Sequence, residues 1–87
     1  MNDDIAEFEK AAVAARQLPE RPDDATMLKL YALYKQGSVG DVQGPRPGFF
    51  DFVGGAKHDA WEKLAGTGQD EPRRQYVDLV RKLGGAV

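Results

Sequence analysis

The sequence contains no cysteine, one histidine and one tryptophan among its 87 residues. Without cysteine, disulfide bonds, thiolate nucleophiles and thiolate zinc sites are all excluded, and the composition fits a reducing compartment. A single histidine also leaves no second imidazole for a histidine-based metal site. We therefore expect a protein without metal or cofactor.

Long apolar runs and a strong excess of one charge are also missing. No stretch approaches the ~20 apolar residues that a membrane-spanning helix needs. The acidic N-terminus, MNDDIAEFEK, lacks the basic start and apolar middle of a secretion signal. A net charge of −2 does not favour general nucleic-acid binding, which depends on phosphate contacts. We expect a cytoplasmic protein with neither a nucleic-acid partner nor integral membrane association.

The patterning predicts a single all-α domain spanning residues 1–87. Apolar residues recur at helical spacing in four segments, and no segment alternates as a strand does. The expected helices cover residues 3–18, 25–38, 52–64 and 70–83. Prolines and glycines separate them, most densely in the long loop at 40–50.

Acidic residues mark the expected helix starts. Asp23 or Asp24 is suited to cap the second helix, and Asp51 the third. Thr67 with Asp70 resembles a capping box, but Pro72 favours a start near Asp70, with the proline in the first turn. Gly37 and Gly40 are expected to mark the end of the second helix.

Each helix has a face that the spacing predicts to be buried. We also expect Trp61 to lie in the core, because so small a bundle needs its large apolar area, and His58 to lie at a rim or on the surface. The predicted buried faces are Ile5, Phe8, Ala12 and Ala15; Met27, Leu30, Tyr31 and Tyr34; Phe52, Ala56, Ala60 and Leu64; and Tyr76, Val80 and Leu83.

The second helix carries an unusual combination of side chains. Tyr31, Tyr34 and Lys35 share one face, which therefore presents two phenol rings and an ammonium group. Such a face suits a ligand that has both a flat ring and phosphates. The spacing alone leaves open an ordinary alternative, in which two core tyrosines lie beside a solvated lysine.

At this segment the sequence resembles a known family. LYALYKQGSVGDV at 30–42 looks like the core signature of acyl-CoA-binding proteins. The similarity continues in RPGFFDF at 46–52, in AKHDAW at 56–61, at the Gly66-Thr67 break and at Tyr76. It extends over nearly the whole chain and implies an up-down-down-up four-helix bundle whose helices form a bowl for acyl-CoA.

The resemblance also implies roles for individual residues. It suggests that Tyr31, Lys35 and Lys57 hold the ribose 3′-phosphate, and that Tyr34 lines the nucleotide site. Tyr76 matches a tyrosine of the last helix that contacts the ligand. The remaining expected contacts are Met27 and Leu28 beside the acyl chain and Arg16 at a position where many members have lysine.

Taken alone, several of these residues have simpler interpretations. Lys57 reads as a surface lysine, Tyr76 as a core tyrosine and Arg16 as a cation at a helix end. Three other positions differ from the family pattern. His58 stands where many members have tryptophan, and Val53 and Gly55 stand where many have lysine.

We therefore expect a monomeric, non-enzymatic carrier that binds, buffers and transports medium- to long-chain acyl-CoA, with acyl-CoA-using enzymes as its partners. Two alternatives remain. One is an interaction module that holds a partner helix on the second-helix face. The other is a small thioesterase, which would need a nucleophile with a base, or an acid that activates water. No such constellation is visible in the sequence.

Overall fold

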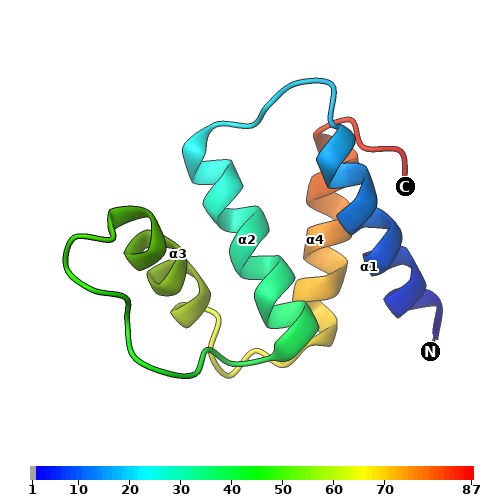
Figure 1. Ribbon diagram of the computed structural model, residues 1–87. Coiled ribbons are helices and arrows are strands. Elements are labelled where there is room, and N and C mark those ends of the chain that lie inside the picture. Colours follow the sequence, from blue (N-terminus) through cyan, green and yellow to red (C-terminus); the bar gives the residue numbers. More distant parts are fainter. Residues whose placement is uncertain (1) are drawn as a thin grey trace.

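The computed structural model describes residues 2–87, and within them the chain forms an all-α bundle. The elements are α1 (Asn2–Ala14), a 3-10 turn η1 (Ala15–Gln17), α2 (Asp24–Val39), α3 (Phe52–Glu62) and α4 (Asp70–Lys82). The helices run up, down, down and up (Figure 1), as the family resemblance implied. Within the described range, no helix is long and apolar enough to cross a membrane.

The expected acidic residues begin α2 and α3. Asp23 accepts a hydrogen bond from the Thr26 amide at 2.8 Å, and Asp51 accepts one from the Gly54 amide at 2.8 Å. Each carboxylate satisfies a helix-end amide that has no partner within its helix. Gly40, with φ of +89°, ends α2 in a conformation that favours glycine.

The start of α4 differs in part from the sequence prediction. The helix begins at Asp70 with Pro72 in its first turn, as expected, but its N-cap residue is Gln69, which makes no side-chain capping bond. The Thr67 hydroxyl donates to the Leu64 carbonyl instead. The capping box that Thr67 and Asp70 resemble does not form, in agreement with the preferred start of the helix near Asp70.

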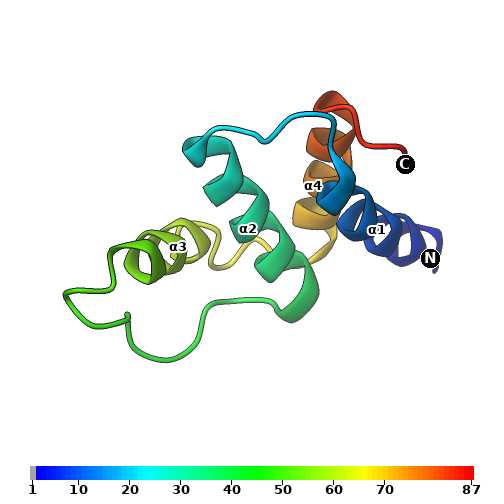
Figure 2. The same cartoon turned by 45° about the horizontal axis from the view of Figure 1, so that its top comes forward.

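The hydrophobic core lies among α1, α2 and α4. Helix α2 packs against α4 and also against α3, while α1 packs against α4. Figure 2 shows α3 on the far side of α2 from α1. The core residues are Phe8, Ala11, Ala14, Leu30, Leu33, Tyr76, Val77 and Val80. None comes from α3, whose one buried residue is Gly55.

The predicted buried faces were partly wrong. In α1 the buried alanines are Ala11 and Ala14, whereas Ile5 is exposed. In α2 the core face includes Leu33, and Tyr34 is exposed. In α3 Phe52 is exposed as well. The reason is common to the three helices: each has apolar residues beyond its core face, and helical spacing alone does not show which face meets a neighbouring helix.

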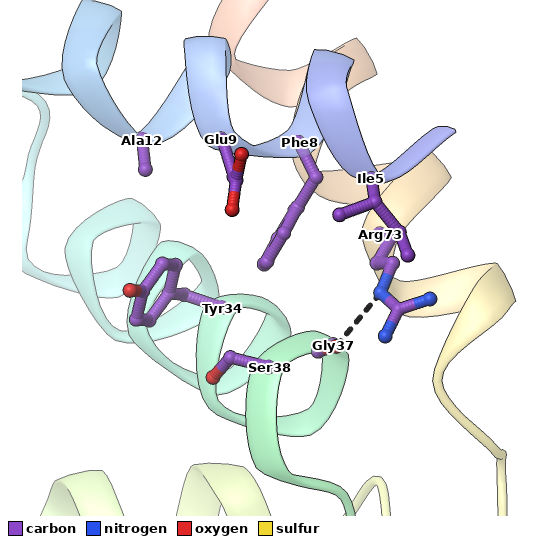
Figure 3. A pocket seen from close by; sticks show the side chains of 8 residues that line it. All are labelled: Ile5, Phe8, Glu9, Ala12, Tyr34, Gly37, Ser38 and Arg73. Carbon is purple, nitrogen blue, oxygen red and sulfur yellow. Dashed lines mark hydrogen bonds between the residues drawn. The ribbon is translucent and has the colours of Figure 1, made fainter. Parts of the chain in front are cut away.

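Three aromatic rings connect the helices of the core. Phe8 stacks on Tyr34 with 5.4 Å between ring centroids and meets Tyr76 edge-on at 5.2 Å. Beside these rings, a cavity of about 350 Å³ opens between α1 and α2 (Figure 3).

Figure 3 also shows Gly37, which the sequence predicted to lie near a helix end. It is buried inside α2, and its carbonyl accepts a hydrogen bond from Arg73 Nε at 2.9 Å.

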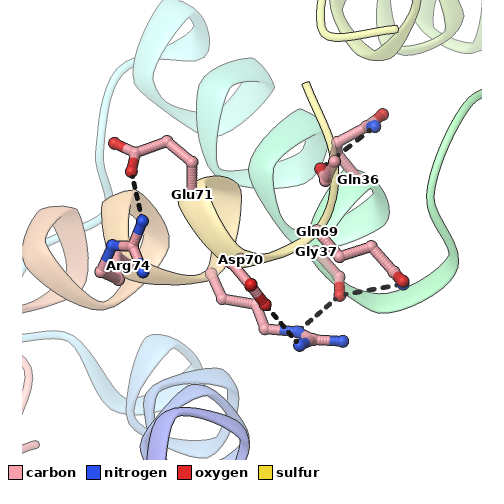
Figure 4. Close-up of polar contacts among 8 residues, drawn as sticks. Gln36, Gly37, Gln69, Asp70, Glu71 and Arg74 are labelled. Carbon is pink, nitrogen blue, oxygen red and sulfur yellow. Dashed lines mark hydrogen bonds and ion pairs between the residues drawn. The ribbon is translucent and has the colours of Figure 1, made fainter. Parts of the chain in front are cut away.

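A polar junction joins the end of α2 to the start of α4. Gln36 is fully buried, and its amide donates to Asp41 Oδ1 at 2.8 Å and to the Gly68 carbonyl at 3.4 Å. Asp41 Oδ1 also accepts from the Gly66 amide at 2.9 Å. Figure 4 shows Gln36 beside the chain that leads into α4. Both connections to α3, the one entering it and the one leaving it, are therefore tied to the same turn of α2.

Further polar contacts hold α3 and the loop that precedes it. The Trp61 indole donates to the Gly40 carbonyl at 2.8 Å and is only half-buried, so the prediction of a core tryptophan was wrong. Arg46 forms a bidentate pair with Asp59, at 2.9 and 3.1 Å. His58 was expected at a rim, but its side chain is only 14% exposed, and its Nε2 lies 3.4 Å from the Gly44 carbonyl.

The junction predicts a pH-dependent contribution of Asp41 to stability. The Gly66 amide and the Gln36 amide lower the pKa of Asp41 below its usual value. Its ionised form therefore stabilises the fold fully above the unfolded pKa of about 3.9, and this contribution is lost as the pH falls through the lower folded pKa. Asp41→Ala should lower the urea midpoint at pH 7, and the difference from the wild type should shrink towards pH 3.

Asp41→Asn is the matched control, because it keeps an acceptor oxygen but does not titrate. It should retain part of the stability and lose the pH dependence of this contribution. A deficit in Asp41→Ala that stays the same from pH 7 to pH 3 would contradict the assignment.

Candidate functional site

A groove of about 660 Å³ lies between α2 and α3. The turn η1 and the middle of α4 also contribute to it, through Ala15 and Tyr76. Most of its surface is apolar or aromatic. The lining residues are Ala15, Arg21, Asp24, Met27, Leu28, Leu30, Tyr31, Tyr34, Phe52, Val53, Ala56, Lys57 and Tyr76.

The groove gathers six of the eight residues that the sequence singled out. They come from three helices, which the fold brings together: Met27, Leu28, Tyr31, Tyr34, Lys57 and Tyr76. Arg16 and Lys35 are the two that do not line it. Helical spacing predicted a shared face for the α2 residues, but only the packing of α3 against α2 places Lys57 opposite Tyr31.

Two lysines and two rings form a crossed pair of contacts between α2 and α3. Lys57 Nζ of α3 lies 5.2 Å from the ring centroid of Tyr31 on α2. In the reverse direction, Lys35 Nζ of α2 lies 5.0 Å from the ring centroid of Trp61 on α3. In both helices the two residues are four positions apart, so the contacts stack one turn apart. They hold two ammonium groups beside one end of the groove.

The residues that line the groove also supply phenol groups. Burial raises the pKa of Tyr76, nearby Tyr34 acts in the same direction, and Arg16 acts against both. The Tyr76 hydroxyl is therefore protonated at neutral pH and can donate a hydrogen bond. Arg16 lies on η1 and does not line the groove, but its positive charge acts on Tyr76.

Tyr34 separates two cavities. Its ring lies 5.8 Å from the Tyr76 ring on the groove side, and it also lines the smaller cavity between α1 and α2 (Figure 3). Phe8 stacks on this ring, at an interplanar angle of 21°. The exposed remainder of the Tyr34 ring offers a flat surface on which another planar group can stack.

Sequence reasoning missed part of the groove wall. Phe52 and Ala56 were correctly placed on one face of the third helix, but that face borders the groove instead of the core. Val53 also lines the groove. At the mouth, Arg21 pairs with Asp24 at 3.6 Å, a contact that no motif indicated. The signal for Phe52 and Ala56 was present in their spacing, but the identity of the neighbouring surface was not.

The arrangement suits an amphipathic ligand. The apolar surface can bury a hydrocarbon chain, and the lysines and tyrosines at the other end can bind phosphates and a planar ring. Within the described part of the chain, the residues lining the groove include no serine, cysteine or histidine. The groove therefore supplies binding groups and lacks the usual nucleophile and base of a hydrolase.

Known proteins resemble this chain in both sequence and fold. The family model described as "Acyl CoA binding protein" matches residues 5–80. The chain is 43% identical over 76 residues to acyl-CoA-binding protein homolog 1 of Caenorhabditis elegans. The aligned segment covers 87% of this chain and 88% of that protein. It is 42% identical over 76 residues to the acyl-CoA-binding protein of Saccharomyces cerevisiae, covering 87% of each.

A solved structure agrees with the sequence comparison. The crystal structure of Oryza sativa acyl-CoA-binding protein 2 superposes with a TM-score of 0.86 at 38% identity, covering 92% of this chain and 89% of that one. The names of these relatives describe binding proteins, in agreement with the expectation of a non-enzymatic protein. The family model spans most of the sequence and the rice protein has the same fold, so the chain belongs to the acyl-CoA-binding protein family.

Proposed function

We propose that this protein binds medium- to long-chain acyl-CoA thioesters in the groove between α2 and α3, and that it buffers and transports them without changing them chemically. The observation that carries the proposal is an apolar groove of about 660 Å³ that is lined by Lys57, with Lys35 one helical turn farther along the same α2–α3 interface. This volume lies within the usual range for small-molecule sites. Membership of the family supports the same ligand.

The apolar wall accounts for the acyl chain. Met27 and Leu28 of α2 face Phe52 and Ala56 of α3 across the groove. Each buried methylene contributes about 0.8 kcal/mol, so affinity rises with chain length until the groove is full. Association and ordering costs remove several kcal/mol or more from that sum. A long chain is therefore needed for tight binding.

The lysines account for the phosphates. Each ammonium group lies over a ring, an interaction worth about 0.5–1 kcal/mol at exposed sites. A charge-assisted hydrogen bond to a phosphate is worth about 1.5–3 kcal/mol. Lys35 and Lys57 therefore gain by turning from Trp61 and Tyr31 to the 3′-phosphate, and the Tyr31 hydroxyl adds a further donor. Arg16 contributes positive charge on the Tyr76 side of the groove.

The tyrosines account for the nucleotide. The exposed Tyr34 ring, supported from behind by Phe8, provides a stacking surface for adenine. Tyr76 is held by the core and keeps its proton, so its hydroxyl can donate to a ligand oxygen. Release of the same ligand to acyl-CoA-using enzymes completes the proposed transport role.

The direct test is calorimetric titration with palmitoyl-CoA below its micelle concentration, with CoA and palmitate as controls. We expect tight one-to-one binding of the thioester and much weaker binding of both controls, because each control lacks half of the interactions. No heat with palmitoyl-CoA, and no competition from any other acyl-CoA, would contradict the proposal. A partner-helix module would then be the better interpretation of the α2 face.

The residue roles predict a graded set of affinities. Lys35→Ala and Lys57→Ala should each weaken palmitoyl-CoA binding by about tenfold or more, because each removes a charge-assisted contact. Tyr31→Phe should have a smaller effect, about threefold to tenfold, because it removes one hydrogen bond from an uncharged donor and no positive charge. Lys29→Ala is the matched control, since Lys29 is an exposed lysine of α2 that does not line the groove.

Circular dichroism should show the same helix content in all four variants. Unchanged affinity in both Lys35→Ala and Lys57→Ala would contradict the phosphate assignment. So would an equal loss in Lys29→Ala, because a general loss of positive charge would then explain the effect.

A further inference from the structure

The loop that enters α3 carries a cluster of exposed phenylalanines, which we call the aromatic tip: Phe49, Phe50 and Phe52. Their exposed fractions are 78%, 85% and 73%. Phe49 contacts both of the others, with ring centroids 5.2 Å and 6.4 Å apart. Large apolar patches on a protein surface commonly mark sites of interaction with proteins or membranes.

Local backbone structure directs two of these rings outward. The Asp51 amide donates to the Gly48 carbonyl at 2.9 Å and closes a turn with Phe49 and Phe50 at its two central positions. Such positions are normally taken by glycine, proline, asparagine, aspartate or serine. Folding of the turn does not require phenylalanine there, and neither ring belongs to the core. The two rings therefore point to a role outside the fold.

The tip lies on a supported loop. The loop passes around the outer side of α3, away from α1 and α4 (Figures 1 and 2). Arg46 anchors it through the bidentate pair with Asp59, and its guanidinium group lies where a Cβ at Gly55 would approach to 2.6 Å. A side chain at position 55 would displace this anchor, so the glycine found there allows the contact.

The two charged residues of the loop around the aromatic tip both have hydrogen-bond partners. Within residues 44–53, all of which the structure describes, Arg46 is paired with Asp59, and Asp51 accepts the Gly54 amide. The charges of Arg46 and Asp59 balance each other, so the Asp51 carboxylate is the one charge in this segment without an opposite charge beside it. A surface with so little charge suits an uncharged or zwitterionic partner better than a highly charged one.

The tip is continuous with the mouth of the groove. Phe52 belongs to it and also lines the groove, as does the adjacent Val53, whereas Phe49 and Phe50 lie outside the lining. We propose that the aromatic tip inserts into the interface of a lipid bilayer, so that the mouth of the groove opens towards the acyl-chain layer. This inference rests on the proposed function, because it describes how a membrane-dissolved acyl chain enters and leaves the groove.

A second copy of the chain fits the patch less well. Three rings of this exposure offer roughly 350–600 Å² of apolar surface. Two such patches face to face would bury roughly 700–1,200 Å² in total, which at most reaches the lower limit of the 1,200–2,000 Å² of a stable interface. A bilayer needs no matching shape, and a protruding turn can enter it more readily than it can form a flat contact with another protein.

The test uses sedimentation of ligand-free protein with sucrose-loaded phosphatidylcholine vesicles. The wild type should bind, and the bound fraction should depend little on salt, because the rings make an apolar contact and phosphatidylcholine has no net charge. Phe49→Ser/Phe50→Ser should reduce the partition coefficient about tenfold or more, because two exposed rings are removed. The control Val13→Ser/Val39→Ser removes two valines that are each 60% exposed elsewhere, and it should bind as the wild type does.

Several outcomes would overturn the inference. They are the absence of vesicle binding by the wild type, equal binding by the two double variants, and sedimentation-velocity evidence that the wild type dimerises through the tip whereas Phe49→Ser/Phe50→Ser does not. A tenfold loss of palmitoyl-CoA affinity in Phe49→Ser/Phe50→Ser without any vesicle binding would likewise assign the rings to the ligand and not to a membrane.

The same proteins separate this inference from the proposed function. If the wild type binds vesicles but not palmitoyl-CoA, the carrier function fails and the membrane contact survives. If Phe49→Ser/Phe50→Ser binds palmitoyl-CoA normally and the wild type ignores vesicles, the groove assignment survives and the membrane contact fails.

Discussion

The position of α3 depends on hydrogen bonds at the end of α2 and not on a hydrophobic core of its own. Gln36, fully buried, binds Asp41 and the Gly68 carbonyl, and Asp41 in turn binds the Gly66 amide. The Trp61 indole adds a bond to Gly40. Helix α3 packs against α2 but supplies no residue to the core, and an apolar groove lies between the two helices.

Two faces of α2 contact different parts of the structure. Leu30 and Leu33 pack into the core with α1 and α4, while Tyr31 and Lys35 meet α3. The crossed lysine–ring contacts help to hold α3 against α2. Under the proposed function, the same two ammonium groups bind phosphate. The aromatic tip lies on the loop that the same helix, α3, holds in place through Arg46 and Asp59.

Local features explain what the sequence could predict. Asp23 and Asp51 act through amides only three residues away, so their caps were predictable, as were the four helices and the long loop. The contacts that place α3 join residues far apart in the chain. Trp61 and Gly40 are one example, and Gln36 and Gly68 are another. Composition and spacing gave no sign of them.

The same distinction applies to the candidate site. The shared face of Tyr31, Tyr34 and Lys35 follows from helical geometry, whereas the place of Lys57 opposite Tyr31 follows only from the packing of two helices. Family resemblance anticipated this pairing because it carries information on packing that a single sequence lacks.

The most direct measurement compares palmitoyl-CoA with its 3′-dephospho analogue, using calorimetry on the wild type, Lys35→Ala and Lys57→Ala. Loss of the phosphate should weaken wild-type binding by about tenfold or more and should have much less effect in either variant. An equal loss in all three proteins would contradict the claim that these lysines hold the 3′-phosphate.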